Sequence, residues 1–433
     1  MAQTLVNINK KGVYSISDVR NRKLKGTWGA TGQRKLFCWG NNPEGMLGHN
    51  NQTEYSSPVQ LPGTTWINTA GYSGGWQGGV KSDGTLWNWG YGDKGNLAQN
   101  NRTDYSSPKQ VGSGTNWIQV GACGQQNGGA ITSTGGLYTW GGTGLGIGRI
   151  DSGNVARSSP VQVGGSDWYF LHSSYPGEMI YGTATTAYAL KTDGRLYSWG
   201  YNQGGALGAQ RAPGVNHRAS SPIQMGWNDA YLADWTTEIA GGAMYGMAIT
   251  KSGALYGWGL NERGQLGTNN KTDYMTPTLV PGSWKTIACT GGYFSGANNQ
   301  GNYNSSLGIR EDGTLWSWGD NEYGQLGLNN KSDYSSPKQV GTDTNWALVA
   351  ANWKSSLATK TDGTLWSWGY NDKGQLGQND RTEYSSPRQV GSATHWPTYR
   401  PYLEGDNEVL GPRGSWAAGF DQGWSVLLAP EDY

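Results

Sequence analysis

A segment of 30 residues occurs twice in this chain in nearly the same form. The first copy is DGTLWSWGDNEYGQLGLNNKSDYSSPKQVG, residues 312–341, and the second is DGTLWSWGYNDKGQLGQNDRTEYSSPRQVG, residues 362–391. Self-similarity at a fixed period is the signature of repeat proteins, whose units bury their apolar faces against their neighbours. The nature of one unit and the number of units therefore constrain the fold more than any other feature.

The dipeptide Trp-Gly near the start of this segment gives the number of copies. It occurs seven times in register, at Trp39, Trp89, Trp140, Trp199, Trp258, Trp318 and Trp368, with spacings of 50, 51, 59, 59, 60 and 50 residues. Short alternating segments rich in aromatic and β-branched residues, separated by Gly, are typical of strands. A period of about 50 residues suits a propeller blade of about four strands. We therefore predict an all-β fold, a seven-bladed β-propeller over residues 31–433.

Three strands of each unit can be assigned from the pattern. In TLWSWG, residues 314–319, the two tryptophans share one face because side chains alternate along a strand. Asp312-Gly313 comes just before and predicts a tight hairpin turn. The small residues of SSLATK, residues 355–360, suit the crowded inner end of a blade. A proline such as Pro337 follows in every copy, three residues before an apolar position, and this predicts a strand at the sheet edge.

The two ends of the chain contain complementary parts of one unit. The first copy, RKLFCWG at residues 34–40, has no small-residue strand before it. The C-terminal segment SWAAGFDQGWSVLLAPEDY, residues 415–433, contains such a strand and then stops where the turn would follow. Pairing the two would close the ring and remove two exposed sheet edges. We therefore predict that the N- and C-terminal strands share one blade.

Composition and charge exclude several classes of protein. The chain has 71 Gly without a three-residue period, which excludes collagen, and 23 Trp and 25 Tyr, which argue against disorder. The 32 basic and 31 acidic residues nearly balance, so no overall field draws the chain to nucleic acid. There is neither a membrane-length apolar run nor a signal-peptide core, and we expect a soluble protein. Cys38, Cys123 and Cys289 lack metal-site or disulfide spacing and are predicted to be buried.

The repeated run resembles that of a known family. LWSWGxNxxGQLG at residues 365–377, followed by SPxQV, is similar to the repeat of the regulator of chromosome condensation family. The resemblance covers about residues 31–433 and implies a seven-bladed propeller. This fold hosts exchange factors, light sensors, ligase-associated modules and binding platforms, so it does not select an activity. The light-sensing members carry a Gly-Trp-Arg-His-Thr run that is absent here, and we interpret the tryptophans as core.

No catalytic, cofactor or metal site is predicted. The histidines His49, His172, His217 and His395 lie in different copies, without a recurring Ser/His/Asp or paired-carboxylate grouping, and are interpreted as solvated loop residues. The Gly-rich run at residues 141–148 aligns with a repeat turn rather than a nucleotide-binding loop. Four of five Asn-x-Ser/Thr sequons share one repeat position and are interpreted as turn asparagines. We expect a non-enzymatic protein.

The segments that depart from the consensus are the candidate binding loops. They are polar and rich in Tyr and Asn, which suits protein or carbohydrate recognition, and they fall at residues 149–160, 172–186, 209–222, 291–304 and 394–414. The candidate partner-binding residues in them are Arg149, Arg157, Tyr175, Glu178, Arg211, His217, Tyr293, Tyr303, Tyr399 and Tyr402. Neutral drift is the alternative for any single insert.

Residues 1–30 belong to no repeat and are a candidate anchoring arm. Basic and apolar side chains are mixed in this arm, which suits docking onto a protein surface, and contact with DNA is the alternative. The candidate anchoring residues are Val13, Tyr14, Ile16, Arg20, Arg22 and Lys23.

The leading functional hypothesis is a non-enzymatic structural component of a bacteriophage virion, such as a fibre, adhesin or decoration protein. Its arm would bind other virion proteins, and its propeller would recognise a glycan or protein of the host surface, as a monomer or a homo-oligomer on the particle. The hypothesis rests on a bare, polar array of closely similar copies. The alternative is a cytoplasmic regulator, either a guanine-nucleotide exchange factor or a scaffold that binds chromatin or protein. Neither nucleic-acid binding nor membrane insertion is expected.

Overall fold

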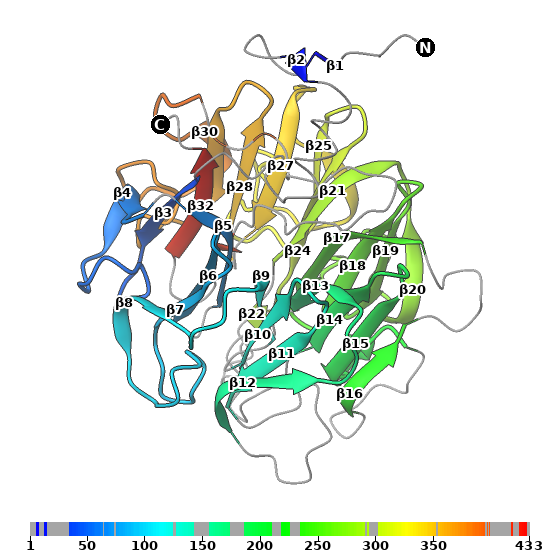
Figure 1. The fold of residues 1–433 in the computed structure, drawn as a ribbon. Coiled ribbons are helices and arrows are strands. Elements are labelled where there is room, and N and C mark those ends of the chain that lie inside the picture. The colour runs from blue at the N-terminus through cyan, green and yellow to red at the C-terminus, as the bar shows by residue number, and fades with distance from the viewer. Residues whose placement is uncertain are drawn as a thin grey trace, which may run out of the picture.

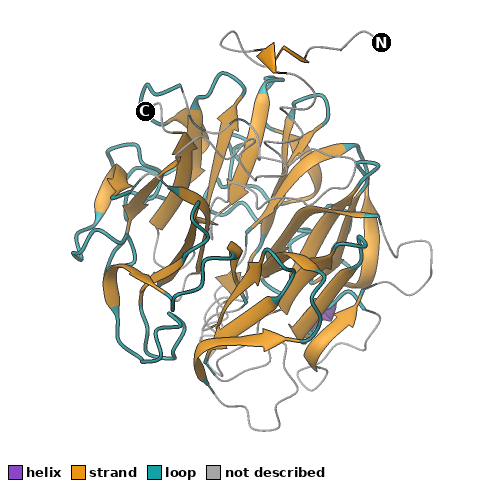
Figure 2. Ribbon diagram, in the orientation of Figure 1, coloured by secondary structure: helices purple, strands orange, loops and turns teal. Residues whose placement is uncertain are grey.

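The computed structural model describes residues 6–7, 13–14, 34–63, 65–72, 75–123, 127–142, 156–173, 186–209, 218–225, 234–290, 292–293, 302–351, 354–394, 396, 398, 417–418 and 424–430. These residues form strands and connecting turns, with one 3-10 turn, η2 (Gln203–Gly205) (Figure 2). The strands form small sheets arranged side by side around a centre (Figure 1). The prediction of an all-β propeller is confirmed.

Six blades are four-stranded antiparallel sheets whose strands follow one another in chain order. We number the repeats 1 to 7 after the seven Trp-Gly tryptophans, so these blades are repeats 2 to 7. Repeats 2 to 4 comprise β5 (Trp66–Tyr72), β6 (Trp76–Lys81), β7 (Leu86–Gly90) and β8 (Tyr105–Gln110); β9 (Trp117–Ala122), β10 (Asn127–Thr132), β11 (Leu137–Gly141) and β12 (Arg157–Val163); and β13 (Trp168–Ser173), β14 (Thr186–Lys191), β15 (Leu196–Tyr201) and β16 (Arg218–Gln224). Repeats 5 to 7 comprise β17 (Trp235–Gly242), β18 (Tyr245–Thr250), β19 (Leu255–Gly259) and β20 (Tyr274–Val280); β21 (Trp284–Cys289), β24 (Ser305–Arg310), β25 (Leu315–Gly319) and β26 (Tyr334–Gln339); and β27 (Trp346–Ala351), β28 (Ser355–Lys360), β29 (Leu365–Gly369) and β30 (Tyr384–Gln389).

One further four-stranded sheet, that of repeat 1, contains strands from both ends of the chain. Its order is β31 (Ala417–Ala418), β32 (Trp424–Pro430), β3 (Arg34–Gly40) and β4 (Tyr55–Leu61). The register between β3 and β32 runs from Arg34 opposite Pro430 to Gly40 opposite Trp424, and Figure 1 shows the blue and red strands side by side. That this pairing holds the ring shut stays a prediction, with a direct truncation test. Two short ladders lie outside these sheets, β1 (Val6–Asn7) with β2 (Val13–Tyr14) and β22 (Gly292–Tyr293) with β23 (Asn302–Tyr303).

The first strand of each repeat is the innermost. β5 packs against β9, β9 against β13, and the series continues through β17, β21, β27 and β31 back to β5. The small-residue strand, such as β28, is second, so the prediction that it lies at the inner end was wrong by one strand. β27, WALVAA, is equally rich in small residues behind its leading Trp, and composition alone does not separate the two. The proline-containing strand is outermost in every sheet, as predicted.

The hydrophobic core is divided into layers between adjacent sheets, with one cluster at each junction of neighbouring repeats. The junction of repeats 7 and 1 joins Leu365 and Val390 to Phe37 and Trp39. The ten largest fully buried side chains are all tryptophans, and the seven Trp-Gly residues are among them. Burying each ring removes about 150–250 Å² of surface from water. The interpretation of the tryptophans as core is therefore confirmed.

Trp-Gly tryptophans also form hydrogen bonds across the junctions. Nε1 of Trp318 donates to the carbonyl oxygen of Gln265 in the preceding repeat at 2.8 Å. The same bond joins the last repeat to the first, where Nε1 of Trp39 donates to the carbonyl oxygen of Gln375 at 3.0 Å. Buried N–H groups need such partners, so the bond favours one angular setting between neighbouring sheets.

The Asp-Gly sequence forms the predicted turn. Gly313 has a φ of +79°, a conformation that favours glycine. Oδ1 of Asp312 accepts hydrogen bonds from the backbone nitrogen and Oγ1 of Thr314 at 3.0 and 2.6 Å. Oγ1 of Thr314 in turn accepts from Nε1 of Trp316 at 2.7 Å, so the turn also orients the half-buried ring.

The three cysteines are free and buried, as predicted. Burial raises the pKa of each thiol well above its usual value, which disfavours the reactive thiolate.

Candidate protein-binding face

Two of the three connections within each blade lie at the same end of the sheet, because neighbouring strands run antiparallel. One joins the first strand to the second, and the other joins the third to the fourth. We call this end of the blades the variable face. Its described connections between third and fourth strands are residues 41–54, 91–104, 260–273, 320–333 and 370–383.

A buried asparagine holds four of these five connections in nearly the same shape, and residues 91–104 have Gly92 at its position. In repeat 6, Oδ1 of Asn321 accepts from the backbone nitrogen of Leu326 at 2.9 Å, and Nδ2 donates to the carbonyl oxygen of Asn330 at 2.9 Å. Equivalent bonds are made by Asn42, Asn261 and Asn371. The asparagine side chain, near the start of the loop, is thus bonded both to the middle of the loop and to a residue near its end. We call this shared loop structure the frame and the asparagine the frame asparagine.

The frame is also tied to the next repeat. The backbone nitrogen of Asn329, a residue with a φ of +55°, donates to the carbonyl oxygen of Ser385 at 2.8 Å. A Cβ on Gly324 would come within 2.6 Å of Cα of Ser385, so only glycine permits this approach. Repeats 5 and 7 make the same bond to their neighbours through Asn269 and Asn379. The variable face is therefore built on a rigid support.

The sequon asparagines belong to this frame, as predicted. Oδ1 of Asn330 accepts from the backbone nitrogen of Ser332 at 2.9 Å, and Asn51, Asn101 and Asn270 form the same turn. The fifth, Asn304, is fully buried.

On this constant frame, different side chains meet at successive junctions. Repeats 6 and 7 are joined by an aromatic and cationic group. The rings of Tyr323 and Tyr370 are 5.0 Å apart in an edge-to-face arrangement, and Nζ of Lys354 lies 4.1 Å from the centre of the Tyr323 ring. Lys354 is only 8% exposed, so the rings take the place of water around part of its side chain. Burial and a hydrogen bond to Asp372 raise the pKa of Tyr370 to about 12, so its phenol stays neutral.

The junction of repeats 5 and 6 is polar instead. Asp320 occupies the position of Tyr370 and is 1% exposed, with Oδ2 accepting from Nε2 of Gln325 at 2.5 Å. Burial, together with the negative charge of Asp333, raises the pKa of Asp320 to about 7, although the guanidinium of Arg263 acts in the opposite direction. Arg263 lies 3.5 Å from Asp333.

The junction of repeats 1 and 2 combines Glu44 with Tyr91. Burial and the nearby Asp104 raise the pKa of Glu44. A hydrogen bond to Asp93 raises the pKa of Tyr91 to about 12. The described junctions thus present chemically distinct groups at equivalent places.

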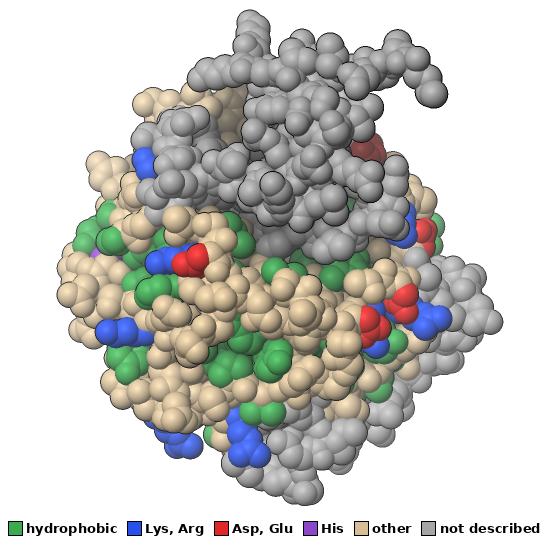
Figure 3. Space-filling view, in the orientation of Figure 1, with side chains coloured by type: hydrophobic (Ala, Val, Ile, Leu, Met, Phe, Trp, Pro, Cys, Tyr) green, Lys and Arg blue, Asp and Glu red, His purple; other side chains and the backbone are tan. Residues whose placement is uncertain are grey.

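Exposed charge at the junction positions of this face is mainly acidic. Glu262, Glu322 and Asp372 are exposed at the position after the frame asparagine. Two nearby cations are already paired, Lys94 with Asp93 at 2.6 Å and Arg263 with Asp333. In the view of Figure 3, charged side chains of the described residues are scattered and of both signs.

Few of the residues that the sequence singled out lie within the described structure. Arg157 begins β12 opposite Gly141, at the end that belongs to the variable face. Tyr293 and Tyr303 lie in β22 and β23, and Val13 and Tyr14 form β2. Outside the described residues lie Ile16, Arg20, Arg22, Lys23, Arg149, Tyr175, Glu178, Arg211, His217, Tyr399 and Tyr402. The roles of these candidates therefore stay predictions.

His172 is not the solvated loop residue that the sequence suggested, whereas His49 is a loop residue but is only partly exposed. His172 lies in β13, and its Nε2 accepts from the backbone nitrogen of Gly241 in the next inner strand at 3.2 Å. His49 is half-buried, with its ring edge-on to Tyr55. Both fill structural positions, and His217 and His395 lie outside the described residues.

Sequence reasoning missed the junction residues because they lie inside well-matched copies rather than in inserts. A signal was present, since the two positions after the frame asparagine differ between copies: Pro43-Glu44, Glu262-Arg263, Glu322-Tyr323 and Asp372-Lys373. Alternation of constant and variable positions is typical of a repeat protein that displays a binding surface.

Within the described residues, no group of three or more His, Cys, Asp or Glu side chains could hold a metal ion. A helix able to cross a membrane is likewise missing from that part of the chain.

Curated relatives match parts of this chain. Human E3 ubiquitin-protein ligase HERC2 is 32% identical over 161 residues, which is 35% of this chain and 3% of HERC2. The Arabidopsis thaliana ultraviolet-B receptor UVR8 is 25% identical over 328 residues, 70% of this chain and 66% of UVR8. The Arabidopsis thaliana mitochondrial protein RUG3, an RCC1 domain-containing protein, is 28% identical over 218 residues, 49% of this chain and 44% of RUG3. The chain thus spans less than two thirds of the length of each of these relatives.

Solved structures share the fold. Human WBSCR16 superposes with a TM-score of 0.71 at 18% identity, over 92% of this chain and all of that one. Prp20p from Saccharomyces cerevisiae superposes with a TM-score of 0.68 at 19% identity, over 92% of both chains. The RCC1-like domain model matches residues 35–400. This chain belongs to the RCC1-like domain family of β-propellers.

Proposed function

We propose that this chain is a protein-binding scaffold that recognises its partner through the variable face. The observation that carries the proposal is the set of junctions, where Glu44 and Tyr91, Arg263 and Asp320, and Tyr323 and Tyr370 occupy equivalent places on one rigid frame. Packing of the core does not require different side chains at these equivalent positions, whereas specific recognition of a partner does.

The chemistry of the face favours a partner surface with basic side chains. Glu322 and Asp372 are exposed and surround an aromatic pair, which suits a contact with cations and apolar groups together. The comparisons support protein binding in general terms, because yeast Prp20p has been solved in studies of its binding to Gsp1p and histones and in complex with Kap60.

Site-specific photo-crosslinking tests the proposal. Crosslinkers at Glu322 and Asp372 probe the variable face, and crosslinkers at Glu311 and Thr361, which are exposed at the opposite end of the same blades, are the matched controls. We expect the same partner to be captured from the first two positions and not from the controls. Capture from the controls alone would contradict the proposal.

Binding of the purified partner gives the second measurement. The double variant Glu322→Lys and Asp372→Lys should weaken binding at least about tenfold, or about 1.4 kcal/mol, and should reduce its salt dependence. Glu311→Lys should leave the affinity unchanged. Equal weakening by both variants would place the interface elsewhere.

The two functions considered from the sequence remain distinguishable. An exchange factor would accelerate release of labelled nucleotide from a bound small GTPase, whereas a plain scaffold would bind without accelerating release. The relatives offer no support for the virion role, which is tested by counting peptides of this chain in purified virus particles. The expectation of a non-enzymatic protein also stays a prediction, since HERC2 is named as a ligase.

A further inference from the structure

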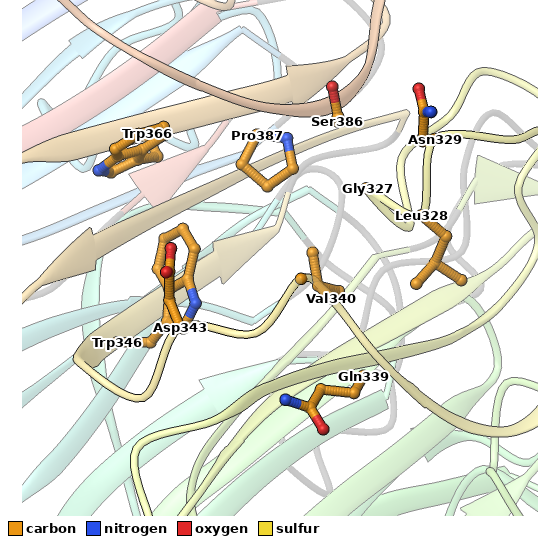
Figure 4. A pocket seen from close by; sticks show the side chains of 11 residues that line it. Gly327, Leu328, Asn329, Gln339, Val340, Asp343, Trp346, Trp366, Ser386 and Pro387 are labelled. Carbon is orange, nitrogen blue, oxygen red and sulfur yellow. The ribbon is translucent and has the colours of Figure 1, made fainter.

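A groove of about 400 Å³ lies between repeats 6 and 7 (Figure 4). Its apolar walls are formed by Leu328 and Val340 of repeat 6 and by Trp366 and Pro387 of repeat 7. The polar side chains of Gln339 and Asp343 lie at its edge. Pockets for small ligands have volumes of about 300–1,000 Å³, so one or two sugar-sized rings fit this space.

A single replacement opens one corner of the groove. In repeats 2 and 7 the corner is bridged by a glutamine. Nε2 of Gln99 donates to the carbonyl oxygen of Lys109, and Nε2 of Gln378 donates to that of Arg388, both at 3.1 Å. Repeat 6 has Leu328 at this position, and its side chain lines the groove instead of bridging it.

A second departure leaves a polar group available at the same place. Gln110 and Gln389, in the outer strands of repeats 2 and 7, donate to the carbonyl oxygens of Gly112 and Gly391 at 3.2 and 3.1 Å. The side chain of the equivalent Gln339 is exposed and makes no hydrogen bond within the described residues, although its backbone pairs with that of Trp316. Its amide therefore offers both a donor and an acceptor to a ligand.

The charge at the groove is balanced. Oδ2 of Asp343 accepts from Nζ of Lys360 at 2.7 Å, and this Nζ lies 4.0 Å from the centre of the Trp366 ring. The ion pair leaves no net charge to attract a strongly charged ligand. The surroundings favour a neutral ligand with an apolar side and several hydroxyl groups.

We propose that this groove binds a neutral sugar ring of a glycan. The C–H side of the ring would lie against Trp366 and Pro387, and its hydroxyl groups would bond to Gln339 and to the outer oxygen of Asp343. A hydroxyl both donates and accepts hydrogen bonds, which matches a primary amide beside a carboxylate. The groove-lining residues include none of the junction residues proposed to contact a protein partner.

Binding of the full chain to an array of neutral glycans, followed by titration of free hexoses and disaccharides under NMR, tests the proposal. We expect binding of at least one neutral sugar. Gln339→Ala should weaken it about tenfold, and Leu328→Gln, which restores the bridge of repeats 2 and 7, should abolish it. Gln389→Ala is the matched control, because the side-chain amide of Gln389 is already bonded to Gly391. This variant should bind the sugar as tightly as the unaltered chain does.

Three outcomes would overturn the proposal. One is no binding across the array, and another is sugar binding that survives both Gln339→Ala and Leu328→Gln. The third is selective binding of a proline-rich peptide in the groove, since aromatic grooves also accept such peptides. The variants Glu322→Lys and Asp372→Lys alter no residue that lines the groove, so they should weaken protein binding without changing sugar binding.

Discussion

At the scale of single residues, each repeated tryptophan has two roles. The ring of Trp318 fills the layer between repeats 5 and 6, and its N–H donates to Gln265 across that junction. Trp316, two residues earlier, is half-buried and donates only to Thr314 in its own turn. Within one strand, Trp318 thus joins neighbouring repeats, whereas Trp316 stabilises a turn.

The replacement Trp318→Phe should lower the free energy of unfolding by more than Trp316→Phe does. The first removes one of two donors to the buried carbonyl oxygen of Gln265, since Oγ of Ser306 also donates to it, and leaves space in the core, at a cost of about 2–4 kcal/mol. The second leaves Thr314 bonded to Asp312 and should cost about 1 kcal/mol or less. Chemical denaturation measures both, and equal losses would contradict the role assigned to the cross-junction bond.

Asp320 should make stability depend on pH. Its pKa in the folded protein is raised to about 7, above the value of an exposed Asp, so its contribution is fully present below about pH 4 and is lost as the pH rises through 7. Asp320→Asn should therefore match the unaltered chain at low pH and be more stable at pH 8, by up to about 4 kcal/mol.

Asp312→Asn is the control of opposite sign. Hydrogen bonds from Thr314 lower the pKa of Asp312, so its contribution is present above about pH 4 and is lost on acidification. Thermal unfolding from pH 2 to pH 8 measures both variants, and parallel pH profiles for the two would show that the environment of Asp320 is misassigned.

At the scale of elements, the loops of the variable face are defined by close backbone contacts with the next repeat. Gly264 has a φ of +78°, and a Cβ there would lie 2.4 Å from Cα of Ser335. Gly341, in the connection from β26 to β27, has a similar φ of +62° but would meet nothing within 4 Å. A substitution at Gly341 would therefore cost only the unfavourable backbone conformation, whereas one at Gly264 would also produce a steric clash.

Gly264→Ala should destabilise the protein by about 2–5 kcal/mol, because it combines conformational strain with overpacking against backbone. Gly341→Ala should cost only the conformational part, about 1–2 kcal/mol. Urea denaturation compares the two. Similar values would mean that neighbouring repeats are not in close contact at Ser335.

At the scale of the whole molecule, the question is what keeps the ring closed. The contacts between repeats 7 and 1 include the bond from Trp39 to Gln375 and the ion pair between Arg381 and Glu54 at 3.1 Å. The sheet of repeat 1 also needs β32, which comes from the other end of the chain. A sheet completed in this way has no exposed inner edge.

Deleting residues 424–433 should lower the melting temperature by several degrees and should promote self-association through the free edge of β3. Deleting residues 431–433 alone spares the paired strand and is the control. Differential scanning calorimetry and light scattering measure the two effects, and a peptide of residues 416–433 added to the truncated chain should reverse them. Unchanged stability would show that the remaining contacts close the ring without β32.

The sequence by itself determined the local and periodic features of this protein. The strands, the Asp312-Gly313 turn, the edge position of Pro337 and the burial of Trp318 each depend on residues a few positions apart, and each recurs in the copies. Only the tertiary structure decided which strand is innermost, that Tyr323 meets Lys354 and Tyr370, and that Leu328 opens a groove toward Pro387. The reason is that these features lie between repeats, where the angle between neighbouring sheets sets which side chains meet, and no spacing along the chain encodes that angle.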